Sequence, residues 1–277
     1  MLHICAIVYI ESYKLSDNRK FNIKGGTILQ STQVIIMWTL LLLCAVGVSA
    51  EHQFHITNRC TQTVWVGILG NSIPEGGGFA LYAGQTHTVH GIPNHWSGRV
   101  WGRTGCGGGR CETGDCGGGR IQCAGAGGVP PVTLAEITFD TGPSNIQDFY
   151  DVSLVDGYNL QMSMKPRSGY SSGSGHYYCA RAGCNADLNA RCPSELAIVK
   201  NGRTVACKSA CLAFNRDDYC CRGAHNVPAT CPPFSYSQIF KSACPEAYSY
   251  AYDDQASTFT CNGNYPGATQ YDITFCG

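Results

Sequence analysis

The sequence has little charge and no excess of either sign. Only 14% of its 277 residues are charged, and 19 basic side chains balance 19 acidic ones. Nucleic-acid-binding proteins neutralise phosphates with clustered Lys and Arg, so this balance argues against a nucleic acid as partner. The sequence also lacks an N-x-S/T sequon and any C-x-x-C pair. N-glycosylation is therefore not expected. No cofactor or metal is expected either, because the sequence lacks the closely spaced ligand pairs that a metal site needs.

Only one long apolar run is present, and it lies near the N-terminus. It spans 34–48, reads VIIMWTLLLLCAVGV and is followed by Ser49 and Ala50. Fifteen residues are short for a bilayer span, whereas an apolar core of this length before small residues is typical of a secretory signal peptide. We predict that 1–50 form an N-terminal extension plus signal peptide, with cleavage after Ala50. Met37 is an alternative start, and an uncleaved N-terminal anchor is the competing interpretation.

Cysteine, in contrast, is abundant. Removal of Cys5 and Cys44 with the predicted leader leaves sixteen of the 18 cysteines, an even number. In a secreted chain this favours disulfides over metal ligands. Nine of the sixteen lie in the loop-rich region 179–244. Spacing alone leaves the pairing open, although a bridge between Cys60 and Cys276 would tie the two ends of the mature chain together.

Short runs of β-branched and aromatic residues, broken by Gly, Pro and Asn, predict a mostly β protein built as a sandwich. The expected strands lie at 54–60, 63–69, 85–92, 99–106, 133–140, 148–156, 160–166, 258–261 and 270–277. Convincing helical spacing occurs only at 205–215 and 235–243. The Gly- and Cys-rich stretch 107–123 has no core pattern, so we expect small disulfide loops there.

Several motifs together resemble one known family, the thaumatin-like proteins of the pathogenesis-related, osmotin type. They are CETGDC at 111–116, NRC at 58–60, WGRT at 101–104, YCC at 219–221 and CPEAYSY at 244–250. The likeness extends from Phe54 to Cys276. It implies a thaumatin-like β-sandwich with two disulfide-rich loop excursions and eight disulfides.

The resemblance also divides 51–277 into parts and implies how the cysteines pair. The sandwich would comprise 54–105, 124–178 and 245–277, with small disulfide loops at 106–123 and a disulfide-rich domain at 179–244. The implied bridges are Cys60-Cys276, Cys106-Cys111, Cys116-Cys123, Cys179-Cys261, Cys184-Cys244, Cys192-Cys207, Cys211-Cys220 and Cys221-Cys231. The first small loop departs from the family, because only four residues separate Cys106 from Cys111.

Family members with an acidic cleft share an Arg, a Glu and three Asp, and each has a candidate in this sequence. The candidates are Arg99, Glu136, Asp151, Asp156 and Asp253. In an unbroken strand Asp151 and Asp156 would face opposite sides, so Asp156 can join the cleft only if the strand ends first. A turn at Asp156-Gly157 would supply that break.

Three interpretations of this cleft stay open. Glu136 as acid, with Asp151 or Asp156 as partner, would make a weak endo-β-1,3-glucanase. Alternatively, the carboxylates accept hydrogen bonds from sugar hydroxyls while Phe149, Tyr158 and Tyr248 stack on the rings, without turnover. In the third interpretation, the charged groups form a static structural network.

The resemblance implies a secreted, extracellular defence protein with antifungal activity. Its expected partner is β-1,3-glucan or another component of the fungal cell wall or membrane, and we expect it to act as a monomer. An enzyme inhibitor or a receptor-binding scaffold on the same fold is the alternative function, because a shared fold does not determine a function.

Overall fold

The computed structural model describes residues 51–118, 120–141 and 146–277. The predicted leader 1–50 and the alternative start at Met37 lie outside these residues. In the described part of the chain, no helix combines the length and apolar character needed to cross a membrane.

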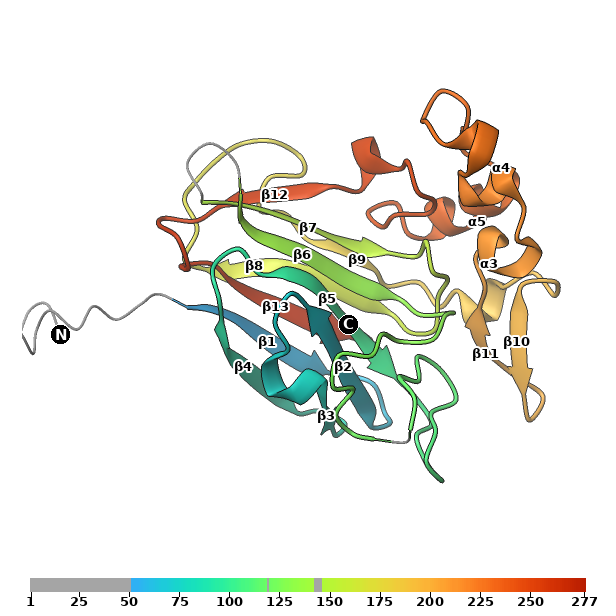
Figure 1. The fold of residues 1–277 in the computed structure, drawn as a ribbon, viewed down its shortest axis with the longest axis horizontal. Helices are drawn as coiled ribbons and strands as arrows, with labels where there is room; N and C mark the ends of the chain where they lie inside the picture. The colour runs from blue at the N-terminus through green and yellow to red at the C-terminus, as the bar shows by residue number, and fades with distance from the viewer. Residues whose placement is uncertain (1–50, 119, 142–145) are drawn as a thin grey trace, which may run out of the picture. The chain divides into compact units, whose positions relative to one another are not determined.

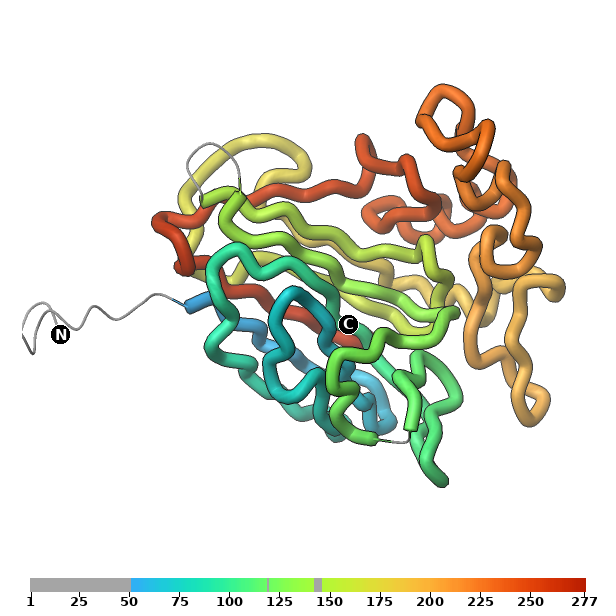
Figure 2. The backbone as a smooth tube through the Cα atoms, viewed as in Figure 1, coloured from blue at the N-terminus to red at the C-terminus, as the bar shows by residue number. Residues whose placement is uncertain are grey.

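Two β-sheets stack face to face and confirm the predicted mostly β sandwich (Figure 1). The five-stranded sheet contains, in spatial order, β4 (Thr86–Ile92), β1 (His52–Asn58), β13 (Gln270–Phe275), β8 (Met162–Ser168) and β9 (Ala182–Cys184). The six-stranded sheet contains β12 (Phe259–Asn262), β7 (Gln147–Ser153), β6 (Leu134–Thr141), β5 (Ser97–Arg103), β2 (Val64–Gly70) and β3 (Gly78–Leu81). The first and last strands, β1 and β13, run parallel side by side, as Figure 2 shows in blue and red.

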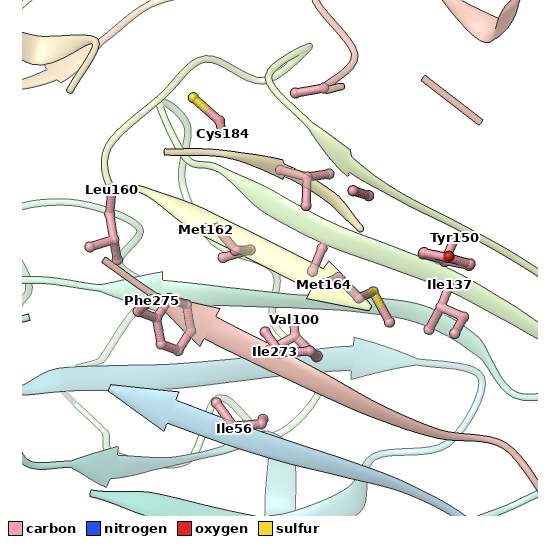
Figure 3. Close-up of a cluster of buried hydrophobic side chains, with 14 of the residues drawn as sticks. Ile56, Val100, Ile137, Tyr150, Leu160, Met162, Met164, Cys184, Ile273 and Phe275 are labelled. Carbon is pink, nitrogen blue, oxygen red and sulfur yellow. The ribbon is translucent and has the colours of Figure 1, made fainter. Parts of the chain in front are cut away.

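The main core lies between the two sheets because one face of each strand is apolar. Along β1, buried and partly exposed residues alternate strictly, as expected for a strand with one face on a core. Ile56 and Ile273 from the five-stranded sheet belong to the same buried cluster as Val100 and Ile137 from the six-stranded sheet, and Figure 3 shows part of this cluster. Each such side chain, fully buried, stabilises the fold by about 1.5–3 kcal/mol.

A second, smaller core covers part of the outer face of the six-stranded sheet. Trp101 and Leu134 point outward from β5 and β6 and pack under the small disulfide loops, against Cys116, Cys123 and Val132. The indole Nε1 of Trp101 donates to the Gly114 carbonyl at 2.9 Å. The small loops are therefore held on this face.

Arg103 fastens the same loops to the sheet. Its buried guanidinium donates to the backbone carbonyls of Trp65 and Val66 on β2 and to those of Arg120 and Ile121 in the loop. Burial lowers the pKa of Arg103. A buried cation destabilises a fold unless its N–H donors are hydrogen-bonded. The bonds from Arg103 to both sets of carbonyls therefore hold the loop beside β2.

The second excursion gathers at one end of the sandwich, to the right in Figure 1. It contains the hairpin β10 (Ala197–Lys200) and β11 (Arg203–Cys207) and the helices α3 (Ala210–Phe214), α4 (Asp217–Cys220) and α5 (Ser235–Ala243). Short 3-10 turns occur at η1 (Pro74–Gly77), η2 (Asn189–Arg191), η3 (Gly223–His225) and η4 (Asp254–Ala256).

The predicted helix at 235–243 coincides with α5, but the one predicted at 205–215 was partly wrong. Its first residues belong to strand β11, and the helix begins only after Ser209. The Ser209 hydroxyl caps the new helix by accepting the Leu212 N–H at 3.2 Å. Cys207 and Cys211 have helical spacing, but Cys207 ends the strand and Cys211 lies in the helix. Only the cap residue Ser209 marks the boundary between them.

The eight disulfides in the structure join the same pairs that the family resemblance implies. The bridge Cys60–Cys276 spans 216 residues and ties the end of β1 to the end of β13. Four of the eight bridges link residues within the 179–244 stretch, which contributes few members to the main core. In this stretch, disulfide bonds therefore provide stability that the burial of apolar side chains provides elsewhere.

Candidate functional site

Three charged side chains form a row on the outer face of the six-stranded sheet. Strand register places Arg99 of β5 opposite Glu136 of β6, and Glu136 opposite Asp151 of β7. Their neighbours along each strand face the core, so these three point away from it. Residues directly opposite on antiparallel strands have Cβ atoms about 4.5–5.5 Å apart, so the row is contiguous.

The row forms the floor of an open groove. On one side it borders a depression of about 520 Å³ that is also lined by Ser97, Thr138, Phe149, Tyr248, Asp254 and Thr258. On the other side it borders a depression of about 380 Å³ that is also lined by Leu134, Ser153, Val155, Asp156, Tyr248 and Ala251. We call the two depressions, with their shared row, the acidic groove.

Asp156 reaches the groove because its strand ends early. Strand β7 stops at Ser153, three residues before the predicted end at 156. The chain then turns, with the Gly157 N–H donating to the Leu154 carbonyl at 2.9 Å. Gly157 has φ +91°, which non-glycine residues rarely adopt. The expected strand break is therefore present, and it brings Asp156 to the side of the sheet that carries Glu136.

The opposite wall comes from the segment between α5 and β12. Tyr248 continues the sheet beyond β7, since its N–H donates to the Val152 carbonyl and its carbonyl accepts the Leu154 N–H, both at 2.9 Å. Its hydroxyl donates to Asp254 Oδ1 at 2.9 Å. Tyr248 and Asp254 are thereby held together at the rim of the groove.

The neighbouring carboxylate, Asp253, has a different environment from that of Asp254. Its Oδ2 accepts the N–H and the hydroxyl of Ser249, at 2.9 and 2.8 Å, and pairs with Lys241 Nζ at 2.8 Å. Asp253 is 9% exposed and does not line the groove, whereas Asp254 does. Sequence reasoning selected Asp253 and missed Asp254, because nothing in a pair of adjacent Asp residues tells which one turns outward.

Tyr158 also lies away from the groove. It is 1% exposed, its ring belongs to the main core, and its hydroxyl donates to the Ala186 carbonyl at 3.0 Å. No face of its ring is free to stack on a sugar. Phe149 is 39% exposed and lines the groove, as does Tyr248.

The structure thus brings together six of the eight predicted site residues. These are Arg99, Glu136, Phe149, Asp151, Asp156 and Tyr248. Besides Asp254, the prediction lacked the hydroxyl side chains Ser97, Thr138 and Thr258. Serine and threonine are common on strand surfaces, so no signal in the sequence separated these three from the others.

Burial shifts the two central carboxyls toward their neutral forms. The pKa of Glu136 is raised mainly by burial and further by Asp156, while Arg99 and the Ser153 hydroxyl oppose the shift. The pKa of Asp151 is raised well above its usual range, first by burial and then by Glu136 and Asp254. Asp151 Oδ1 is buried and has no hydrogen-bond partner among the residues that the structure describes. The groove floor therefore carries an acceptor that is ready for a ligand.

Within the part of the chain that the structure describes, one other cluster has the side-chain types of a metal site. His52, Asp140 and Asp148 are fully buried with their ligand atoms within 4.8 Å of one another. The histidine is already engaged, with Nδ1 2.9 Å from the Thr269 carbonyl and Nε2 2.9 Å from Asp140 Oδ2. Asp148 accepts hydrogen bonds from the Tyr271 hydroxyl and the Asp140 N–H. Hydrogen bonds therefore already engage both ring nitrogens of His52 and both oxygens of Asp148, whereas Asp140 Oδ1 has no partner among the described residues.

Two stacked sheets, eight disulfides and an acidic groove define a disulfide-rich β-sandwich of the kind that the sequence motifs suggested. The chain belongs to the Thaumatin family, whose model matches residues 58–277.

Named relatives and a solved structure extend this assignment. The chain is 50% identical over 254 residues to "Pathogenesis-related protein 5" of Arabidopsis thaliana, covering 88% of this chain and 98% of that protein. It is 44% identical over 257 residues to "Glucan endo-1,3-beta-glucosidase" of Prunus avium, covering 90% of this chain and all of that protein. A laminaripentaose-producing β-1,3-glucanase, solved with laminaritetraose, shares the fold with a TM-score of 0.51 at 11% identity, over 82% of this chain and 99% of the other.

Proposed function

We propose that this protein binds β-1,3-glucan of fungal cell walls in the acidic groove and acts as an antifungal defence protein. The observation that carries the proposal is the Arg99–Glu136–Asp151 row in an open groove. The names of the relatives support the biological setting, since one is a pathogenesis-related protein and another a glucan endo-1,3-β-glucosidase.

The chemistry of the groove suits an uncharged, hydroxyl-rich polymer. A carboxyl whose pKa is raised stays partly protonated in mild acid, so it can both donate to and accept from sugar hydroxyls. The unpartnered Asp151 Oδ1 gains a hydrogen bond when a sugar hydroxyl reaches it. The exposed ring of Phe149 offers an apolar surface for the C–H face of a sugar. Binding requires no turnover.

Slow endo-hydrolysis is the second candidate function, and the direct opposition of Glu136 and Asp151 favours it. Glu136, whose pKa is raised, would give its proton to the glycosidic oxygen as the bond from that oxygen to the anomeric carbon breaks. In the same step Asp151 or Asp156, in its ionised form, would either attack the anomeric carbon, giving a glycosyl-enzyme that water then hydrolyses, or take a proton from the water that attacks this carbon, depending on its separation from Glu136.

We also propose that the protein is secreted and acts in the extracellular space. Eight disulfides persist in oxidising compartments and are rare in the cytosol. The predicted signal peptide and the pathogenesis-related relatives agree with this location.

The test combines retention on insoluble β-1,3-glucan with an assay for released reducing ends. Protein from an oxidising expression host is compared with Glu136→Gln, and Glu75→Gln serves as control because Glu75 lies outside the acidic groove. Retention without sugar release would make the protein a lectin-like binder. Release that Glu136→Gln abolishes and Glu75→Gln leaves intact would make it an enzyme. If the wild type is not retained on any glucan, the proposal is wrong and the enzyme-inhibitor or receptor-binding alternative takes its place.

A further inference from the structure

A second row of side chains crosses the same three strands, two residues along each strand from the charged row. Register places Ser97 of β5 opposite Thr138 of β6, and Thr138 opposite Phe149 of β7. These residues lie two positions from Arg99, Glu136 and Asp151, so they share the outward face. Because a strand rises about 3.4 Å per residue, the two rows are about 6.8 Å apart.

This row differs chemically from the charged one. The hydroxyls of Ser97 and Thr138 lie 2.8 Å apart and hydrogen-bond each other, which fixes two neighbouring polar oxygens on the groove floor. Beside them, the partly exposed ring of Phe149 supplies an apolar surface. All three line the groove, and none is charged.

The two ends of the acidic groove are therefore unlike. Beyond the charged row on the other side, the lining includes Asp156, with Ser153 and Leu134. A ligand that fills the groove along the strands meets the Asp156 carboxyl at one end and an uncharged floor at the other, where Asp254 contributes a carboxyl only from the rim. Each hydroxyl can donate and accept at once, and the ring is apolar, so the neutral end matches one sugar unit better than a charged group.

We propose that Ser97, Thr138 and Phe149 form a neutral subsite for one glycosyl unit of a chain that lies along β5, β6 and β7. The chain crosses the Arg99–Glu136–Asp151 row at its middle and reaches the neutral subsite at one end. This inference rests on the proposed glucan binding and adds the direction of the polymer and a length preference. Oligomers that are long enough to cover both rows gain contacts that short ones lack.

The experiment measures the affinity for glucose and for β-1,3-linked glucose oligomers, from the dimer to the hexamer, by titration calorimetry. Thr138→Val removes one hydroxyl with almost no change in shape, and Phe149→Ala removes the exposed ring. Thr260→Val is the matched control. Thr260 is on β12, where it pairs with Phe149 of β7, and it does not line the groove. Asp151→Asn reports on the charged row. Circular dichroism and thermal unfolding check that each variant is folded.

Wild-type affinity is expected to rise with oligomer length. Thr138→Val should bind the hexamer about fivefold more weakly, as expected for one hydrogen bond. Phe149→Ala should bind it about tenfold more weakly, as expected for a lost apolar contact. Both variants should bind glucose itself as the wild type does, because one unit covers only one row, and Thr260→Val should match the wild type throughout.

Two results would overturn the subsite while leaving the proposed function intact. One is unchanged hexamer binding by both variants when Asp151→Asn weakens it. The other is an equal loss for glucose and the hexamer, which would place the row inside the central site. If the wild type binds no oligomer and no insoluble glucan, the proposed function and the subsite are both wrong.

Discussion

Asp148 and Asp151 lie three residues apart on β7 and face opposite sides of the same sheet. Burial raises the pKa of both carboxyls, and it is the largest cause in each case. Asp148 faces inward and accepts hydrogen bonds from the Asp140 N–H and the hydroxyls of Thr269 and Tyr271. Asp151 faces the groove, and its buried Oδ1 has no partner among the described residues. Both carboxyls are therefore buried, but they differ in the number of hydrogen-bond donors that the fold supplies. Asp148 is satisfied by the protein, whereas Asp151 has an oxygen left for a ligand.

The same contrast recurs in the adjacent pair Asp253 and Asp254. Asp253 turns inward to Lys241 and Ser249, and it holds the loop that forms a wall of the groove. Asp254 turns outward and meets Tyr248 at the rim. An inward carboxylate therefore positions the groove, and an outward one lines it.

Replacing Asp148 should have the largest effect on stability. Asp148→Ala leaves two buried hydroxyls and a backbone N–H without an acceptor, so the free energy of unfolding should fall by about 3–5 kcal/mol. Denaturant titration with the disulfides intact measures this change. Glucan retention per folded molecule should stay unchanged, and a loss of stability below about 1 kcal/mol would contradict the structural role.

Lys241→Met should have the next largest effect, because it leaves Asp253 without its cation. Nζ also lies 2.9 Å from the Ala247 carbonyl and 2.8 Å from the Ser257 hydroxyl, so it ties both ends of the wall segment. We expect a loss of about 2 kcal/mol in unfolding free energy, at the low end for a broken ion pair since Lys241 is partly exposed.

The double variant Lys241→Met/Asp253→Asn provides the control for that prediction. It removes the uncompensated charge and should recover part of the lost stability, as measured by thermal unfolding. Equal losses in the single and double variants would show that the charge of Asp253 is unimportant.

Asp151→Asn should separate binding from stability. The variant removes a carboxylate that repels Glu136 and Asp254, so the unfolding free energy should not fall. Affinity for β-1,3-glucan should drop about tenfold, because the amide presents one acceptor where the carboxyl presents two oxygens. Calorimetry and thermal unfolding on the same sample test both halves. A clear loss of stability with unchanged binding would contradict the binding role of Asp151 and give it a structural role instead.

The last prediction is a pH dependence of stability. A carboxyl whose pKa is higher in the folded than in the unfolded state stabilises the fold below its unfolded pKa, and this contribution is lost as the pH rises through the folded pKa. For Glu136 and Asp151 the loss begins near their ordinary values of 4.5 and 3.8. Each unit of upward shift costs about 1.4 kcal/mol once the group is ionised.

The variant Glu136→Gln/Asp151→Asn, which does not titrate at these positions, isolates that dependence. The unfolding free energy of this variant, relative to that of the wild type, should increase as the pH rises from about 4 to 7. Denaturant titrations at several pH values give the difference directly. A difference that stays constant with pH would mean that the pKa values of these carboxyls are not raised.

Much of the molecule could be predicted from the sequence because the relevant signals are local. Period-two alternation sets which side chains of one strand share a face, and it showed that Asp156 can join Asp151 in the cleft only if the strand ends first, as β7 does at Ser153. Gly157 marked the turn that admits Asp156. The even cysteine count and the family motifs indicated eight bridges within a mostly β sandwich.

Only the tertiary structure decided which side chains meet and which stay free. Ser97, Thr138 and Phe149 form a row through strand register, which joins side chains from three different strands and leaves no mark on any single strand. Tyr158 was expected at the groove but lies in the core, because the excursion packs over it. Asp253 and Asp254 are identical in local sequence terms, and they differ because Lys241 of a separate helix reaches only one of them. A strand pattern sets the direction of a side chain, whereas its partners come from elements that are distant along the chain.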